Sequence, residues 1–160
     1  MTIESIEFML QERCDNESLK IKEKSYTQER LLSLKESKLS DSSFHNSMFT
    51  YAHSLLQSNY RKDWILAKHS FRELYELTAD QKLKRDCLFY SSLIEIKLHN
   101  YKSADRFAKA ILYFEPFNSQ ALALTEYIQN VEKKNFIIGS SVIGTALVSG
   151  LLVLGGIFLR

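Results

Sequence analysis

The sequence predicts an all-α fold, a bundle of about six helices followed by a single C-terminal transmembrane helix. The first observation is that all five glycines lie in the last 22 of the 160 residues, where average usage of about 7% would place roughly nine among residues 1–135. Hairpin turns and bulges of β-rich domains normally need glycine. The second observation is helical spacing of apolar residues, and the third is an uncharged stretch at residues 136–159.

Composition narrows the function classes. The chain is 45% apolar and 25% charged, with a formal net charge of +2, which is globular and too weakly charged to indicate a nucleic-acid partner. Phosphate-binding loops need glycines that residues 1–135 lack, so a nucleotide enzyme is not expected. Two isolated cysteines, Cys14 and Cys87, indicate a reducing compartment. The N-terminus has no secretory signal and is expected to stay in the cytosol.

The first 43 residues are predicted to form an N-terminal helical arm. Ile3, Ile6 and Leu10 give residues 3–10 one apolar face, typical of a short amphipathic helix. Residues 11–38 contain 13 charged positions out of 28, which indicates a helical or partly mobile arm. The run at 40–43 reads as a linker and helix-capping zone.

Residues 44–132 carry the clearest helical periodicity. One helix ends near Ser58 and a second spans the region of Trp64 to Tyr75. A third, over residues 81–98, is apolar on two sides, so it must lie between neighbours or present one side to a ligand. Ser103 is predicted to cap a fourth helix, which Pro116 ends. Asn118 or Ser119 is then predicted to cap the last helix, which leads toward the uncharged stretch.

These helices form two repeated hairpins. Asn59-Tyr60-Arg61 recurs 41 residues later as Asn100-Tyr101-Lys102. In the second unit, the small, aromatic, alanine and proline positions of a tetratricopeptide repeat are filled by Ser92, Tyr101, Ala104 and Pro116. The sequence therefore predicts two tetratricopeptide-like hairpins, with the flanking helices as caps.

The first helix of each such hairpin lines the concave surface, and this register gives a candidate partner-binding groove. Its predicted residues are Phe49, Ala52, Leu56, Asp86, Phe89, Leu93 and Ile96. The alternative is that Phe89, Leu93 and Ile96 are plain core. Arg85 and Asp86 are either polar groove contacts or a solvated helix start.

The 24 residues from 136 to 159 carry no charge. As a helix they span about 36 Å, enough for a bilayer core of about 30 Å. The sequence predicts a tail anchor through Phe136, Gly144, Gly150 and Leu159, with the domain on the cytosolic side of the lipid bilayer and Lys133 and Lys134 before it. Moderate hydrophobicity favours the mitochondrial outer membrane, while peroxisomes and the endoplasmic reticulum stay open as alternatives. Small residues spaced i,i+4 in the span leave a homo-oligomer open.

No catalytic or metal-binding pattern is present in the sequence. The four histidines have no metal-ligand spacing, and no nucleophile–base pair or carboxylate dyad stands out. Cys87, on an apolar helix face, reads as a small core residue. We therefore expect a binding protein with no catalytic residue, metal or cofactor.

Four stretches stand out in order along the chain: Phe49-Thr50-Tyr51-Ala52, Arg85-Asp86-Cys87-Leu88-Phe89-Tyr90, Lys97-Leu98-His99-Asn100-Tyr101 and Glu115-Pro116-Phe117-Asn118-Ser119-Gln120-Ala121, followed by the span. Together they resemble the mitochondrial fission 1 family, which consists of tail-anchored adaptors of the outer mitochondrial membrane. The resemblance covers about residues 44–160. It implies a six-helix bundle with a concave groove. It also implies recruitment of a dynamin-related GTPase, directly or through soluble adaptors, to divide mitochondria and often peroxisomes.

The chain departs from the family pattern at His53, where an aromatic residue is usual, and at Ala67 and Ile94, where glycines are usual. The alternative function is another tail-anchored tetratricopeptide-like receptor or tether. A fusion-type coiled coil needs long heptads running into the span, and Pro116 interrupts them. A chaperone-docking repeat needs a basic clamp, and no clear set of Lys and Arg lies on the candidate groove side.

Overall fold

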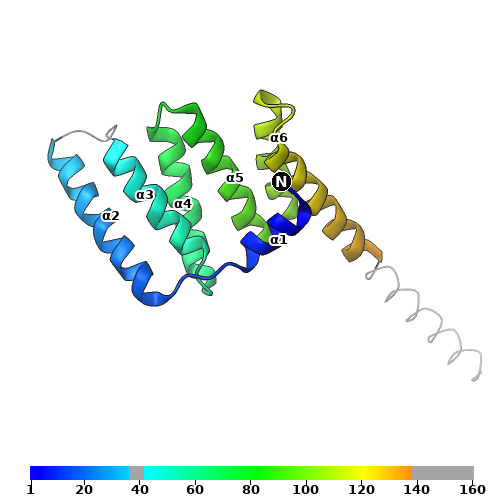
Figure 1. The fold of residues 1–160 in the computed structure, drawn as a ribbon, viewed down its shortest axis with the longest axis horizontal. Coiled ribbons are helices and arrows are strands. Elements are labelled where there is room, and N and C mark those ends of the chain that lie inside the picture. Colours follow the sequence, from blue (N-terminus) through cyan, green and yellow to red (C-terminus); the bar gives the residue numbers. More distant parts are fainter. Residues whose placement is uncertain (37–41, 138–160) are drawn as a thin grey trace, which may run out of the picture.

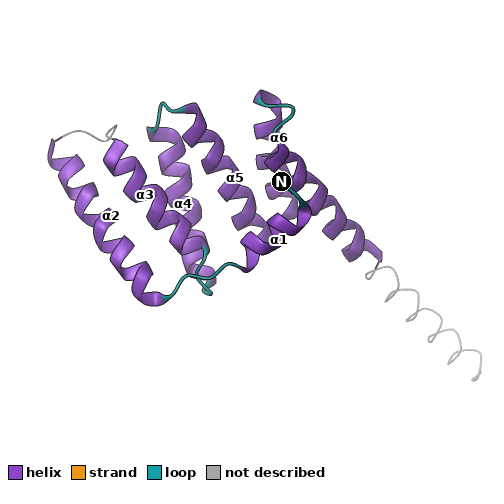
Figure 2. Ribbon diagram, viewed as in Figure 1, coloured by secondary structure: helices purple, strands orange, loops and turns teal. Residues whose placement is uncertain are grey.

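The computed structural model describes residues 1–36 and 42–137, and in these ranges all regular structure is helical (Figure 2). The predicted all-α fold is confirmed. The helices are α1 (Ile3–Gln11), α2 (Asn16–Glu36), α3 (Ser42–Leu56), α4 (Arg61–Leu77), α5 (Gln81–Lys97), α6 (Tyr101–Phe114) and a final helix over residues 119–137. The described part thus has one helix more than the predicted six.

Helices α2 to α6 pack in chain order (Figure 1). From α2 to α6, each helix contacts the next, so α3–α4 and α5–α6 form two consecutive hairpins. The final helix starts after the turn that follows α6, and its C-terminal end points away from the bundle. This arrangement is that of the predicted tetratricopeptide-like bundle.

Close packing of small residues joins the second hairpin. The Ser92 hydroxyl donates to the Ala104 carbonyl at 2.9 Å, and both residues are fully buried. A larger side chain at either position would separate α5 from α6. The small and alanine positions of the repeat thus meet where the two helices pack together.

Helix starts follow the capping residues, with one correction. The Asn118 side-chain oxygen accepts from the Ala121 N–H at 3.0 Å, so Asn118 caps the final helix as predicted. The prediction that Ser103 caps α6 is wrong. That helix begins at Tyr101, and the Asn100 carbonyl accepts from the Ser103 and Ala104 N–H groups. Ser103 therefore lies inside the first turn.

Helix α5 is the centre of the core. Leu93 and Ile94 point to different sides, yet both are at most 1% exposed, as expected for a helix between α4 and α6. Glu95 is also buried, at 2% exposed, and its carboxylate pairs with Lys68 of α4 at 2.5 Å. The same carboxylate accepts from the Asn100 side-chain amide at 2.9 Å, so this buried charge has two partners.

The arm packs on the first hairpin. The Tyr26 ring of α2 stacks on Tyr51 and Phe44, with ring centroids 5.0 and 6.1 Å apart. Arg30 donates to the Tyr26 hydroxyl and pairs with Glu73 of α4 at 3.1 Å. The charge density of residues 11–38 predicts an arm that is either helical or partly mobile. The structure has a helix there, α2, which packs against α3 at one end of the bundle.

Within the described ranges, no helix has both the length and the apolar character needed to cross a bilayer. The predicted span over residues 136–159 lies outside the described residues, apart from Phe136 and Ile137. Both of these are exposed at the end of the final helix.

Candidate functional site

The seven predicted groove residues lie on two helices, α3 and α5, as the hairpin register requires. Phe49 and Asp86 are half-buried. The other five are at most 5% exposed: Ala52, Leu56, Phe89, Leu93 and Ile96. In the described conformation these five are interior residues, so they do not form an open apolar surface.

The cause of this burial is packing from several sides. α5 lies between α4 and α6, and α1 adds a buried residue to the same core. Ile6 of α1 is fully buried in the same apolar cluster, and Met9 and Leu10 pack against it. Phe89, Leu93 and Ile96 therefore lie in the core, as the alternative interpretation of the sequence states. A partner-binding role for the α3–α5 face stays a prediction.

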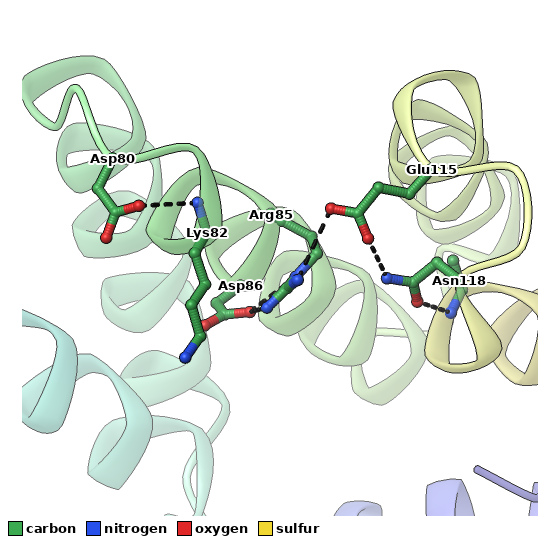
Figure 3. Close-up of polar contacts among 7 residues, drawn as sticks. Asp80, Lys82, Arg85, Asp86, Glu115 and Asn118 are labelled. Atoms are coloured by element: carbon green, nitrogen blue, oxygen red, sulfur yellow. Dashed lines mark hydrogen bonds and ion pairs between the residues drawn. The ribbon is translucent and has the colours of Figure 1, made fainter.

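Polar residues gather at one end of this face, where α5 begins (Figure 3). The Arg85 guanidinium donates to the Asp86 carboxylate at 2.9 Å and lies 3.6 Å from the Glu115 carboxylate. Arg85 and Asp86 side chains are 27% and 28% exposed, so both can be reached from solvent. Arg85 thus connects α5 with the turn that precedes the final helix.

Aromatic rings fill the middle of the face. Tyr90 of α5 stacks on Phe71 of α4 and meets Phe49 and His53 of α3 edge-on, with centroids 5.0–5.4 Å apart. Burial lowers the pKa of His53, and nearby Lys22 and Lys97 lower it further against the opposing effect of Glu12. The imidazole is therefore neutral and packs as one more ring in the cluster. This explains how histidine can occupy a position where the family that the sequence resembles usually has an aromatic residue.

The N-terminal segment crosses the other end of the face. The Cys14 N–H donates to the Gln57 carbonyl at 3.1 Å, just after α3. Beside it, the Lys97 ammonium donates to the Leu56 carbonyl at 2.6 Å and lies 5.2 Å from the Trp64 ring centre. Burial, aided by the Arg13 guanidinium, lowers the pKa of Lys97 to about 8, although Glu12 opposes this.

This lysine predicts a pH dependence of stability. Above about pH 8 the unfolded chain holds a proton that folded Lys97 has released, so Lys97 makes the free energy of unfolding rise with pH. Burial raises the pKa of Cys87 and of Tyr51 to about 12, and these groups have the opposite effect above about pH 9 and pH 10, respectively. Denaturant titrations at pH 7.5–9.0 should show the rise. Lys97→Met should flatten it and Lys62→Met, at an exposed position, should not. Equal slopes in the two variants would contradict the assignment.

Burial raises the pKa of the Cys87 thiol to about 12, so it stays protonated at neutral pH and is a poor nucleophile. In residues 1–36 and 42–137, no group of three or more His, Cys, Asp and Glu side chains could hold a metal ion.

Sequence reasoning missed three features of this site. It did not foresee the aromatic cluster across α3, α4 and α5, for which the four-residue spacing of Phe49 and His53 was the available signal. It missed the contact between Tyr26 and the first hairpin, because α2 has no clear apolar stripe. It also missed that Glu115 and Arg85 would meet, since they are 30 residues apart.

Comparison of the sequence with known proteins finds relatives that have the same kind of helical repeat. Residues 85–135 match the family model of the Fis1 C-terminal tetratricopeptide repeat. The chain is 35% identical over 113 residues to the mitochondrial fission 1 protein of Neurospora crassa, covering 70% of this chain and 71% of that protein. It is 33% identical over 109 residues to the protein of the same name from Candida albicans, covering 68% and 70%.

Solved structures share the fold. The structure of yeast Fis1 in complex with an Mdv1 fragment containing N-terminal extension and coiled-coil domains has a TM-score of 0.64 at 21% identity, covering 84% of this chain and 94% of that one. The crystal structure of Fis1 from Saccharomyces cerevisiae gives 0.61 at 22% identity, covering 86% and 96%. At this level of identity the likeness concerns the fold.

Proposed function

Because the chain belongs to the mitochondrial fission 1 protein family, we propose that it is an adaptor anchored in the mitochondrial outer membrane that recruits the division machinery from the cytosol. The observation that carries this proposal is identity of 33–35% over about 70% of two fission 1 proteins. Two hairpins that present a continuous α3–α5 face support it, because stacked helical repeats typically bind partners along such surfaces.

The immediate partner that we propose is a soluble adaptor with an N-terminal extension and a coiled coil, by analogy with the Mdv1 fragment bound to yeast Fis1. This adaptor in turn brings a dynamin-related GTPase, and the direct binding of that GTPase is the alternative. The same recruitment on peroxisomes is part of the proposal.

The proposed docking surface is the α3–α5 face. Its accessible parts are the partly exposed Phe49 in the middle and the Arg85–Asp86 pair at one end. The N-terminal segment after α1 crosses the other end, where the Cys14 N–H donates to the Gln57 carbonyl. A partner segment that occupies the whole face must therefore displace this N-terminal segment, and the two compete for the face.

Residues 136–159 anchor the domain in this proposal, with residues 1–135 on the cytosolic side. The uncharged length matches the bilayer core. Lys133 and Lys134 lie exposed at the end of the final helix, where cationic side chains favour the cytosolic leaflet.

Recruitment to membranes tests the proposal. Vesicles carrying the full chain should sediment a purified adaptor fragment with N-terminal extension and coiled coil. Asp86→Arg should reduce this binding, because it breaks the pair with Arg85 and reverses a charge on the face. The matched control is Asp105→Arg on α6, where the carboxylate is 25% exposed and pairs with Lys109 at 2.6 Å. Equal binding by both variants would place the adaptor elsewhere, and no binding by the wild-type chain would contradict this partner.

A further inference from the structure

The end of α6 and the turn that follows it carry unusually exposed aromatic side chains. We call residues 113–117, the last two residues of α6 and the three after them, the aromatic turn. Phe117 is 94% exposed, Tyr113 80% and Phe114 74%, which makes them three of the four most exposed large apolar side chains in the described part of the chain. Several exposed aromatic side chains within five residues of a solvent-exposed surface indicate a binding site.

The aromatic turn is held in one shape (Figure 3). The Glu115 carboxylate accepts from the Asn118 side-chain amide at 2.7 Å and lies 3.6 Å from the Arg85 guanidinium. Asn118 also caps the final helix through the Ala121 N–H. Pro116 restricts the backbone between them. A partner therefore meets aromatic side chains on a preorganised turn, which lowers the entropic cost of binding.

The size of the patch argues against a second copy of this chain as its occupant. Three aromatic side chains at these exposures offer about 400–600 Å², whereas a stable interface buries about 800 Å² on each partner. A contact here must be part of a larger one that continues onto neighbouring surface.

The position of the turn argues against the bilayer to which the chain is anchored. The turn precedes the final helix, and residues 119–135 of that helix span about 26 Å before the proposed anchor. The turn lies at one end of that helix, and the described part of the helix ends at residue 137 at its other end (Figure 1). The occupant is therefore a soluble molecule that approaches from the cytosol.

Contacts connect the turn with the α3–α5 face. Arg85 of α5 touches Glu115 in the turn and Asp86 on the face, so the two surfaces are continuous. The single Arg85 guanidinium pairs with both carboxylates.

We propose that the aromatic turn is a second contact for the soluble partner, binding apolar side chains of the segment that leaves the α3–α5 face beside Asp86. This inference rests on the proposed function, because it takes the partner from it. It adds a binding site at 113–117 that lies outside the predicted groove.

A photo-crosslinking experiment in cells tests the inference. The full chain carries p-benzoylphenylalanine at Phe117, at Asp86, or at Ile21, a control on α2 that is 64% exposed. We expect position 117 to trap a soluble coiled-coil protein that position 21 does not trap. Trapping of another copy of this chain at position 117, or of no protein, would overturn the inference. Position 86 reports separately on the α3–α5 face, so the proposed docking surface can fail while the turn contact stands.

Substitutions give an independent readout. Phe114→Ser with Phe117→Ser removes two exposed rings, so the fold should keep its melting temperature. Binding of the trapped protein should weaken about tenfold or more, as for aromatic anchors at interfaces. Ile21→Ser is the control for loss of an exposed apolar side chain. Unchanged affinity in the double variant would overturn the inference.

Discussion

Replacement of Leu93 by arginine is expected to unfold the helical domain. Leu93 is 1% exposed at the centre of α5. Truncating such a leucine to alanine costs about 2–5 kcal/mol, and an unpaired buried charge costs more. The total stability of a domain is about 5–15 kcal/mol, so little or none should remain. Circular dichroism at increasing temperature should show loss of the cooperative transition.

Ile65→Arg is the control for this experiment. Ile65 lies on α4 and is 42% exposed, so an arginine there can reach water and the melting temperature should change little. A Leu93→Arg variant that melts like the wild type would show that Leu93 faces solvent. In that case Leu93 belongs to an open groove, and the packing of α5 described above is incorrect.

Removal of residues 136–160 is expected to abolish membrane association. The 24 uncharged residues at 136–159 provide the apolar length that a bilayer core requires, and nothing comparable lies in the described helices. In carbonate extraction of mitochondria, the full chain should stay with the membrane pellet. The truncated chain should move entirely to the supernatant and keep its helical content.

A variant that lacks residues 2–11 is the control for truncation as such. It loses α1 and should remain in the pellet, because the proposed anchor is intact. Recovery of the full chain in the supernatant, or of the truncated chain in the pellet, would contradict the tail-anchor proposal.

The fold could be predicted because its signals are local. The absence of glycine in residues 1–135 and the helical spacing around Trp64 and Ala104 depend only on neighbouring positions. Helix starts were harder to predict, as Ser103 shows: several residues near Asn100 can cap a helix, and tertiary packing selects among them. The 41-residue repeat supplied the pairing of helices, because stacked hairpins follow chain order.

The candidate site was less predictable. Periodicity places Phe89 and Leu93 on apolar faces of α5, but it cannot say whether a neighbour covers those faces. Here α4 and α6 do so, because α5 lies between them. Phe117 is the opposite case, an apolar residue that turns out to be exposed. A phenylalanine in a turn carries no sequence signal that tells whether it is buried. Burial depends on how the turn meets α5 through Arg85 and Glu115.

The proposed recruitment of division machinery to mitochondria is tested most directly by mitochondrial morphology. In cells that lack their own fission 1 protein, mitochondria should be elongated and fused into networks. Expression of the full chain should restore separate, short mitochondria, whereas residues 1–135 alone should not. Mitochondria that stay elongated, although the full chain reaches their outer membrane, would contradict the account.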